Sequence, residues 1–157
     1  MHVIIMRHGD AKPVHRQDSL RPLSSFGHKQ AKAAGKWLQQ RYLTAGIDMC
    51  LVSPYVRARE TLAEVSGEVQ ISHEATSSDI TPDGSVRLTH DYLNFLISDK
   101  KINRSLLIIS HMPFVSYLVD ELTGSEQSLF FDTSSIVTIE YCPKKGRGTL
   151  IEVYHPL

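Results

Sequence analysis

Three short runs of continuous apolar residues stand out along the chain, at residues 3–6, 49–52 and 106–109. Each run is too short for a helix, and an unbroken apolar run is typical of a central parallel strand covered on both faces. Residues 135–141 and 149–154 alternate between apolar and polar side chains instead. This alternation predicts outer or antiparallel strands, joined by a turn at residues 144–146.

Between these strands, apolar positions recur at the spacing of a helix, and capping residues mark where each helix begins and ends. Ser24 and Ser25 can cap a helix that runs to about Tyr42. The other predicted helices open at Pro54 and stop near Gly67, begin at Asp83 or Ser85, and cover residues 114–122 with Pro113 in the first turn and Gly124 beyond the end. The predicted fold class is α/β, a three-layer sandwich whose mostly parallel central sheet carries helices on both faces.

Length and charge exclude several classes of protein. A chain of 157 residues favours a single domain over residues 1–157. The 17 Lys and Arg residues balance 17 Asp and Glu residues, so the chain lacks the positive field that nucleic acid or an anionic membrane surface needs. Nowhere do 18 apolar residues follow one another, and the first apolar run is too short for a signal peptide. We therefore expect a cytoplasmic protein that binds neither nucleic acid nor a membrane.

The two cysteines, Cys50 and Cys142, have no metal-ligand spacing. Each lies in an apolar, strand-like run, which predicts two buried thiols rather than a disulfide.

Each of the three buried strands is followed at once by residues with reactive or charged side chains. These are Arg7-His8-Gly9 after the first strand, Ser53 to Arg57 after the second, and Ser110-His111-Met112-Pro113 after the third. In open α/β sheets, ligands bind outside the carboxyl ends of the strands. We therefore expect Arg7, His8, Arg57 and His111 to converge, although they are far apart in the sequence.

Such a group of side chains is suited to phosphate. Guanidinium groups present planar pairs of donors that match phosphate oxygens. The helix that opens at Pro113 adds backbone N–H groups, including that of Met112, at its positive end. A metal site on His8 and His111 has no support, because an HExxH motif is lacking and the neighbouring arginines would repel a cation. The sequence predicts a phosphoryl-binding site without a metal or other cofactor.

Single histidines and arginines have an ordinary structural interpretation elsewhere in the chain. Arg41 and Arg59 are interpreted as solvated charges, and the six other histidines as surface or core residues. Of those histidines, only His15 lies in the segment that follows the first motif and could approach the site.

The motifs carry a resemblance to a known family. The Arg-His-Gly motif at residues 7–9, the Ser-Pro-x-x-Arg-Ala-x-x-Thr pattern at 53–61 and the Ser-His-x-Pro pattern at 110–113 resemble the histidine phosphatase (phosphoglycerate mutase-like) superfamily. Within it, the Asp-Ala that follows the first motif, the Arg-Pro-Leu-Ser-x-x-Gly pattern at 21–27 and the short length resemble the SixA-type phosphohistidine phosphatases. The resemblance covers nearly the whole chain in order.

The resemblance implies roles for the predicted site residues. His8 would be the nucleophile and would carry a phosphohistidine intermediate, with its other ring nitrogen held by a backbone carbonyl near Gly9. Arg7, Arg57 and His111 would hold the phosphoryl oxygens, with His111 as a protonated donor. Asp79, the first carboxylate of the loop at residues 79–84, takes the position of a candidate proton donor.

Two residues have a weaker claim to the site. Arg21 could contact phosphate or the substrate protein, and an exposed loop arginine is nearly as good an interpretation. Asp83, which precedes Gly84, is better explained as a turn or cap residue.

The leading functional hypothesis is a phosphatase that acts on a phosphohistidine-bearing protein, such as a phosphotransfer domain or a phosphocarrier. Only 38 residues, 67–104, separate the second helix from the third buried strand, so no long insertion can cover the site. We expect a shallow, open pocket that admits a phosphorylated side chain of another protein. The alternatives are a small-molecule phosphomonoesterase of the same superfamily and a non-catalytic phosphoprotein-binding module.

Overall fold

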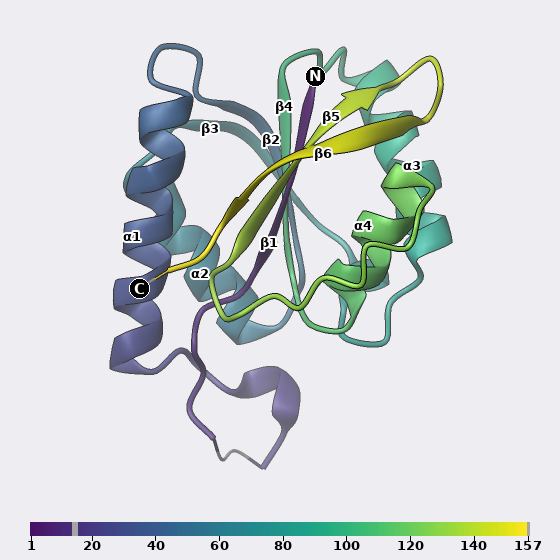
Figure 1. Cartoon of the computed structure of the whole chain (residues 1–157). Helices are drawn as coiled ribbons and strands as arrows, with labels where there is room; N and C mark the ends of the chain where they lie inside the picture. Colours follow the sequence, from purple (N-terminus) through teal and green to yellow (C-terminus); the bar gives the residue numbers. More distant parts are fainter. Residues whose placement is uncertain (14–15, 157) are drawn as a thin grey trace.

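A mixed sheet forms the centre of the protein in the computed structural model, which describes residues 1–13 and 16–156 (Figure 1). Its strands are β1 (His2–Arg7), β2 (Ile47–Val52), β3 (Ile71–Thr76), β4 (Ser105–Ser110), β5 (Ile136–Cys142) and β6 (Arg147–Tyr154). The strand order is β3-β2-β4-β1-β5-β6. The pairs among β1 to β4 are parallel, whereas β5 is antiparallel to both β1 and β6. The predicted antiparallel character of the last two strands is confirmed.

Helices cover both faces of the sheet, as expected for a three-layer sandwich. They are α1 (Ser25–Arg41), α2 (Val56–Ser66), α3 (Val86–Asp99) and α4 (Phe114–Thr123), with two short 3-10 helices, η1 (Asp18–Leu20) and η2 (Ser78–Ile80). In Figure 1, α1 and α2 lie on one side of the sheet and α3 and α4 on the other. Because side chains alternate along a strand, Ile4 of β1 packs with α1 and α2, whereas Ile5 packs with α3 and α4.

The helices begin and end close to the predicted residues because the expected caps form. The Ser24 hydroxyl accepts a hydrogen bond from the Gly27 N–H, and the Ser85 hydroxyl accepts one from the Leu88 N–H. At the end of α4, Gly124 adopts a left-handed conformation with φ of 67°, which glycine reaches at little cost.

Strand β3 was not predicted from the sequence. It lies at the edge of the sheet, and among the described strands it pairs only with β2. Three successive residues of this strand, Ser72 to Glu74, are exposed. A strand of this kind is held by backbone hydrogen bonds rather than by apolar burial, so it leaves little hydrophobic pattern. The prediction of two buried thiols is half right, because Cys50 is buried and Cys142 is only partly buried at the end of β5. Both cysteines are free.

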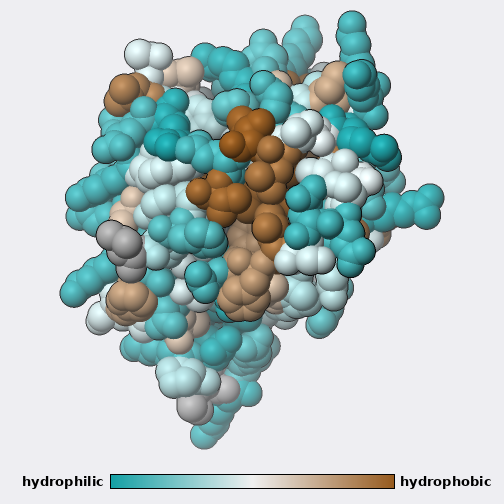
Figure 2. All heavy atoms as spheres, viewed as in Figure 1, coloured by the Kyte–Doolittle hydropathy of each residue, from teal (hydrophilic) through white to brown (hydrophobic). Residues whose placement is uncertain are grey.

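At the opposite edge of the sheet, β6 has one neighbour. Figure 2 shows a mostly polar face with an apolar patch in its middle. Ile151 and Val153 belong to β6, which crosses the middle of this view in Figure 1, and they are 50% and 38% exposed.

No helix in the described part of the chain is long and apolar enough to cross a membrane.

The carboxyl ends of the parallel strands β1, β2 and β4 lie side by side, on the same end of the sheet. Immediately after β1, the His8 N–H donates to the Ser110 carbonyl at the end of β4 (3.0 Å). Immediately after β2, the Ser53 N–H donates to the Ile109 carbonyl (3.1 Å). The parallel register therefore brings together the three segments that follow these strands.

Candidate active site

His8 is held in one orientation directly after β1. Its Nδ1 lies 2.6 Å from the Gly9 carbonyl oxygen. Because a carbonyl only accepts hydrogen bonds, Nδ1 carries the hydrogen and Nε2 keeps its lone pair. Burial lowers the pKa of His8 to about 3; the Gly9 carbonyl opposes this shift, and the charges of Arg57 and Arg7 add to it. The ring is therefore neutral at pH 7.

His111 faces His8 from the end of β4. The two ring centroids are 5.0 Å apart in an edge-to-face arrangement. The Nε2 of His111 lies 2.7 Å from the Ser53 hydroxyl, so this serine orients the ring. Its Nδ1 is buried and has no hydrogen-bond partner among the described residues.

This arrangement of protein groups disfavours a proton on His111, and the expectation of a protonated donor to bound phosphate stays a prediction. Burial, followed by the neighbouring His8 and Arg57, lowers the pKa of His111 to about 2. A ring that is 1% exposed cannot easily hold a proton beside a guanidinium. A neutral imidazole still carries one N–H, so it can donate a single hydrogen bond.

Arg57 reaches the same point from the first turn of α2. Its side chain is 4% exposed, and its Nε–H donates to the Nε2 of His8 at 3.3 Å. Its Nη1 and Nη2 donate to the backbone carbonyl (2.8 Å) and a carboxylate oxygen (3.1 Å) of Asp18 in η1. The structure therefore brings His8, His111 and Arg57 together from the ends of three strands.

Arg7 completes the group from the last position of β1. Its Nη1 donates to the Phe131 carbonyl at 2.8 Å, and its Nε is buried without a hydrogen-bond partner in the described part of the chain. Burial lowers the pKa of Arg7; Asp132 opposes this effect and Arg57 adds to it. Within the described residues, Arg7 thus keeps an unused donor, and its charge also lowers the pKa of both His8 and His111.

A frame of hydrogen bonds fixes the segment that carries His8. The Thr61 hydroxyl accepts from the Gly9 N–H (3.0 Å) and donates to the Arg57 carbonyl (2.7 Å), which links the first motif to α2. The start of α1 packs against the same segment so closely that a Cβ on Gly27 would lie 1.9 Å from the Asp10 carbonyl oxygen. Any side chain at residue 27 would therefore displace the segment.

The remaining predicted residues lie nearer the margin. The Arg21 Nε donates to the Asp18 carboxylate at 2.9 Å, so its guanidinium faces that carboxylate rather than the histidine rings. The backbone N–H of Met112 makes no hydrogen bond within the described residues, which leaves it available as a donor. His15 lies outside the described residues.

Asp79 belongs to η2, which is hydrogen-bonded to the end of β4. The Ser110 hydroxyl donates to the Ile80 carbonyl at 2.5 Å, so η2 is bonded to the residue before His111. The Asp79 carboxylate makes no hydrogen bond or ion pair with any described residue. Within the described residues it is therefore a carboxylate without a structural partner, in a segment bonded to the residue before His111.

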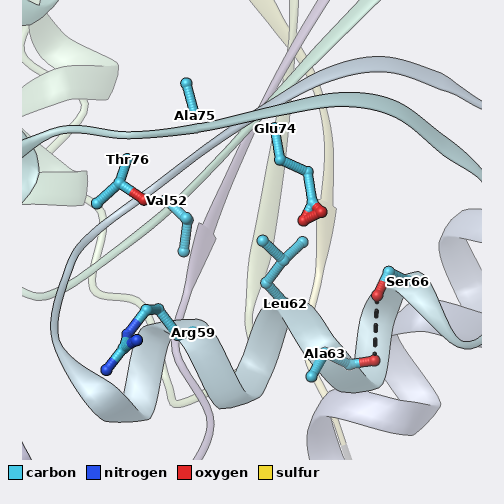
Figure 3. A pocket seen from close by; sticks show the side chains of 8 residues that line it. All are labelled: Val52, Arg59, Leu62, Ala63, Ser66, Glu74, Ala75 and Thr76. Atoms are coloured by element: carbon cyan, nitrogen blue, oxygen red, sulfur yellow. Dashed lines mark hydrogen bonds between the residues drawn. The ribbon is translucent and has the colours of Figure 1, made fainter.

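A separate cavity of about 370 Å³ lies between α2 and β3, as shown in Figure 3. Its lining includes Arg59 and Glu74, together with apolar side chains such as Leu62. None of the four converging residues lines it. In the part of the chain that the structure describes, no group of three or more His, Cys, Asp or Glu side chains could hold a metal ion.

Comparison with known proteins places this arrangement in a family. The model of the histidine phosphatase superfamily (branch 1) matches residues 3–78. The phosphohistidine phosphatase SixA of Escherichia coli is 38% identical over 150 residues, which cover 95% of this chain and 90% of the relative. The chain belongs to the histidine phosphatase superfamily.

Two further comparisons support the same placement. A SixA homolog of Haemophilus influenzae is 37% identical over 145 residues, covering 88% of this histidine phosphatase and 87% of the homolog. A solved structure of the protein histidine phosphatase SixA complexed with tungstate superimposes with a TM-score of 0.91 at 37% identity, covering 99% of this chain and 97% of that one.

Sequence reasoning missed one prominent residue of this histidine phosphatase. Asp18 contacts both Arg57 and Arg21, and it was not among the predicted site residues. Its spacing of three residues from Arg21 was the available signal, because such a pair can meet within one turn. Thr61 was not among the predicted site residues either, and its hydroxyl holds the first motif in place.

The expectation of a shallow, open pocket stays a prediction about the shape of the site. Residues 67–104 form β3, η2 and α3 and contain no long insertion, as predicted. The histidine phosphatase nevertheless covers its central residues, since His8 is only 5% exposed. The cover over Arg57 comes from η1, in the segment between β1 and α1.

Proposed function

We propose that this protein is a phosphohistidine protein phosphatase. It removes the phosphoryl group from a phosphohistidine side chain of a signalling or phosphocarrier protein, and His8 carries the phosphoryl group as a covalent intermediate. Residues 1–157 act in this proposal as one catalytic domain, in the cytoplasm. The proposal is supported by the family and by relatives whose own names describe phosphohistidine phosphatases.

The observation that carries the proposal is the state of the His8 ring. A nucleophilic imidazole must be neutral, fixed in tautomer and oriented toward phosphorus. The hydrogen bond from Nδ1 to the Gly9 carbonyl fixes the tautomer, and burial keeps the ring neutral by lowering its pKa. The nitrogen that remains, Nε2, points to the Arg57 guanidinium, which is a natural phosphate-binding group.

The reaction takes two displacements. First, the Nε2 of His8 attacks phosphorus, a new N–P bond forms, and the N–P bond to the substrate imidazole breaks. The oxygen of a water molecule then attacks the phosphorus on His8, and the second N–P bond breaks. The electron pair of that bond returns to Nε2, and both water hydrogens leave on the phosphate as dihydrogen phosphate.

Arg7, Arg57 and His111 would hold the equatorial oxygens in both steps, with the Met112 N–H and Arg21 as further donors. Positioning and charge stabilisation of this kind supply most of the catalysis in phosphoryl transfer. The phosphoryl dianion would also favour a proton on His111 by offsetting the neighbouring positive charges.

The leaving group decides how much acid catalysis the site needs. An imidazole that is already protonated leaves phosphorus with little help, whereas an alkoxide needs a proton. Asp79 is our candidate donor for that proton. Its carboxylate has no partner among the described residues, and η2 is bonded to the end of β4 beside His111. A site that depends weakly on Asp79 would favour phosphohistidine over phosphate esters.

The test of substrate class is a hydrolysis panel with purified protein. The panel compares a phosphohistidine-bearing phosphotransfer domain, a phosphohistidine-bearing phosphocarrier and several sugar phosphates, each with and without a chelator. We expect hydrolysis of the phosphohistidine proteins and no effect of the chelator. A preference for sugar phosphates would instead support the small-molecule phosphomonoesterase.

The test of mechanism is the substitution His8→Ala. Turnover should be lost because no nucleophile remains, while inorganic phosphate should still bind through the arginines. His28→Ala is a matched control on the surface of α1, and it should keep full activity. Unchanged turnover in the His8 variant would refute the covalent mechanism. A native protein that binds phosphate but hydrolyses none of the substrates would point to a binding module.

A further inference from the structure

The Asp18 carboxylate binds two arginines, Arg57 and Arg21, that the proposed function assigns to phosphate. One oxygen of its carboxylate accepts from the Arg57 Nη2 at 3.1 Å, and the other accepts from the Arg21 Nε at 2.9 Å. Its backbone carbonyl accepts from the Arg57 Nη1 at 2.8 Å. Two oxygens bridging two guanidiniums make the same kind of contacts that a phosphoryl group would make.

These contacts use three of the five N–H groups of Arg57. Its Nε–H is directed at the His8 Nε2, and both terminal nitrogens face Asp18. A phosphoryl group that binds the Nη2 of Arg57 where Asp18 now binds it must displace the Asp18 carboxylate. His8 can attack only after its Nε2 lone pair is released from the Arg57 Nε–H.

The Asp18 carboxylate is placed where such an exchange costs little. Its side chain is 60% exposed, and η1 buries none of its three residues. The base of the segment is anchored separately, since Ala11 bridges to Leu23 and the Leu23 N–H donates to Glu60 at 2.7 Å. The contacts of Leu23 with Ala11 and Glu60 can stay in place while the exposed Asp18 carboxylate breaks its hydrogen bonds to the arginines.

We infer that Asp18 is an internal competitor for the phosphoryl group, which must replace its carboxylate on Arg57 and Arg21. The inference rests on the proposed function for the placement of phosphate. Because a dianion carries twice the charge of a carboxylate, the phosphoryl group wins the exchange, whereas a singly charged anion gains little. Asp18 thus sets the affinity for phosphate and favours fully charged phosphoryl groups.

The test is calorimetric titration of inorganic phosphate at pH 7 into the native protein and three variants. Asp18→Asn removes the competing charge and keeps the shape of the side chain. When a competing state holds about nine-tenths of the molecules, its removal tightens apparent binding about tenfold, so we expect a dissociation constant about five- to tenfold lower. Asp18→Glu keeps the charge and should stay within about twofold of the native protein.

Glu152→Gln is the matched control, because it removes a carboxylate from an exposed ion pair with Arg41, a residue of α1, and changes the net charge equally. It should bind phosphate as the native protein does. The phosphate inhibition constant and the KM for phosphohistidine should fall together in the Asp18→Asn variant. A merely structural role for Asp18 predicts the reverse, since loss of its support would weaken phosphate binding.

The outcomes are distinguishable from failure of the proposed function. If the native protein binds phosphate without hydrolysing phosphohistidine, the proposed function fails, and tighter binding by Asp18→Asn still supports the inference. Equal or weaker binding by Asp18→Asn, or no phosphate binding by any of the four proteins, overturns it.

Discussion

The rings of His8 and His111 lie edge to face with their centroids 5.0 Å apart, and both are almost completely buried. Neither ring has a carboxylate partner in the contacts described above; their neighbours are guanidiniums, a hydroxyl and a backbone carbonyl. Burial, together with these positive neighbours, lowers the pKa of His8 to about 3 and that of His111 to about 2. The fold therefore holds two neutral imidazoles where solvent would let them titrate near 6.5.

This arrangement predicts that stability falls in mild acid. Below pH 6.5 the unfolded chain takes up protons on these rings and the folded protein does not, so each ring costs about 1.4 kcal/mol of unfolding free energy per pH unit as the pH falls. The measurement is chemical denaturation between pH 7.5 and 4.5. In His8→Gln, the slope of unfolding free energy against pH should be smaller by about 1.4 kcal/mol per pH unit, which corresponds to one proton. His73→Gln, at an exposed position on β3, is the control, and an equal slope in both variants would contradict the prediction.

Thr61 should matter more than an ordinary buried threonine. Its hydroxyl joins the Gly9 N–H to the Arg57 carbonyl, so Thr61→Val leaves a buried N–H without its partner and keeps the side-chain volume. We expect a loss of about 1–3 kcal/mol in unfolding free energy, with a fall in kcat because the first motif is no longer fixed. Thr76→Val, at an exposed position on β3, should change neither quantity. A fully stable and active Thr61 variant would show that the bridge is dispensable.

The sequence was sufficient where one strong physical rule applied. Continuous apolar runs identify β1, β2 and β4, and the rule that parallel strands end at one edge brings His8, Arg57 and His111 together. Strand β3 escaped prediction because it is polar and held by its neighbour. Asp18 escaped because its contact with Arg57 of α2 depends on the tertiary placement of η1. The lowered pKa of His111 depends on burial that no motif encodes.

Ser53 is predicted to act through His111. Its hydroxyl is the hydrogen-bond partner of the His111 Nε2, at 2.7 Å. In Ser53→Ala, neither ring nitrogen keeps a partner among the described residues, so the ring loses its fixed orientation. One such hydrogen bond corresponds to a fall of about five- to tenfold in kcat. Ser53→Thr keeps the hydroxyl and should recover most of the activity; equal losses in both variants would mean that the site responds to volume rather than to the hydrogen bond.

Asp79 provides the sharpest division between substrate classes. If its carboxylate protonates a departing alkoxide, Asp79→Asn should lower kcat on phenyl phosphate and alkyl phosphates by at least about tenfold, because a general acid contributes strongly when the leaving group is basic. Hydrolysis of phosphohistidine should change by less than about threefold, because the departing imidazole is already protonated. The measurement is kcat for both substrate classes in parallel.

The control for this prediction is Asp83→Asn, an exposed carboxylate of the neighbouring turn, which should affect neither class. Equal losses on phosphohistidine and on phenyl phosphate would mean that Asp79 supports the geometry of η2 rather than the leaving group. No loss on either would remove Asp79 from the reaction. Only a selective loss of activity on the phosphate esters agrees with a site whose acid group is weak. Such a site favours the phosphoramidate bond of phosphohistidine, because the imidazole that leaves needs no further proton.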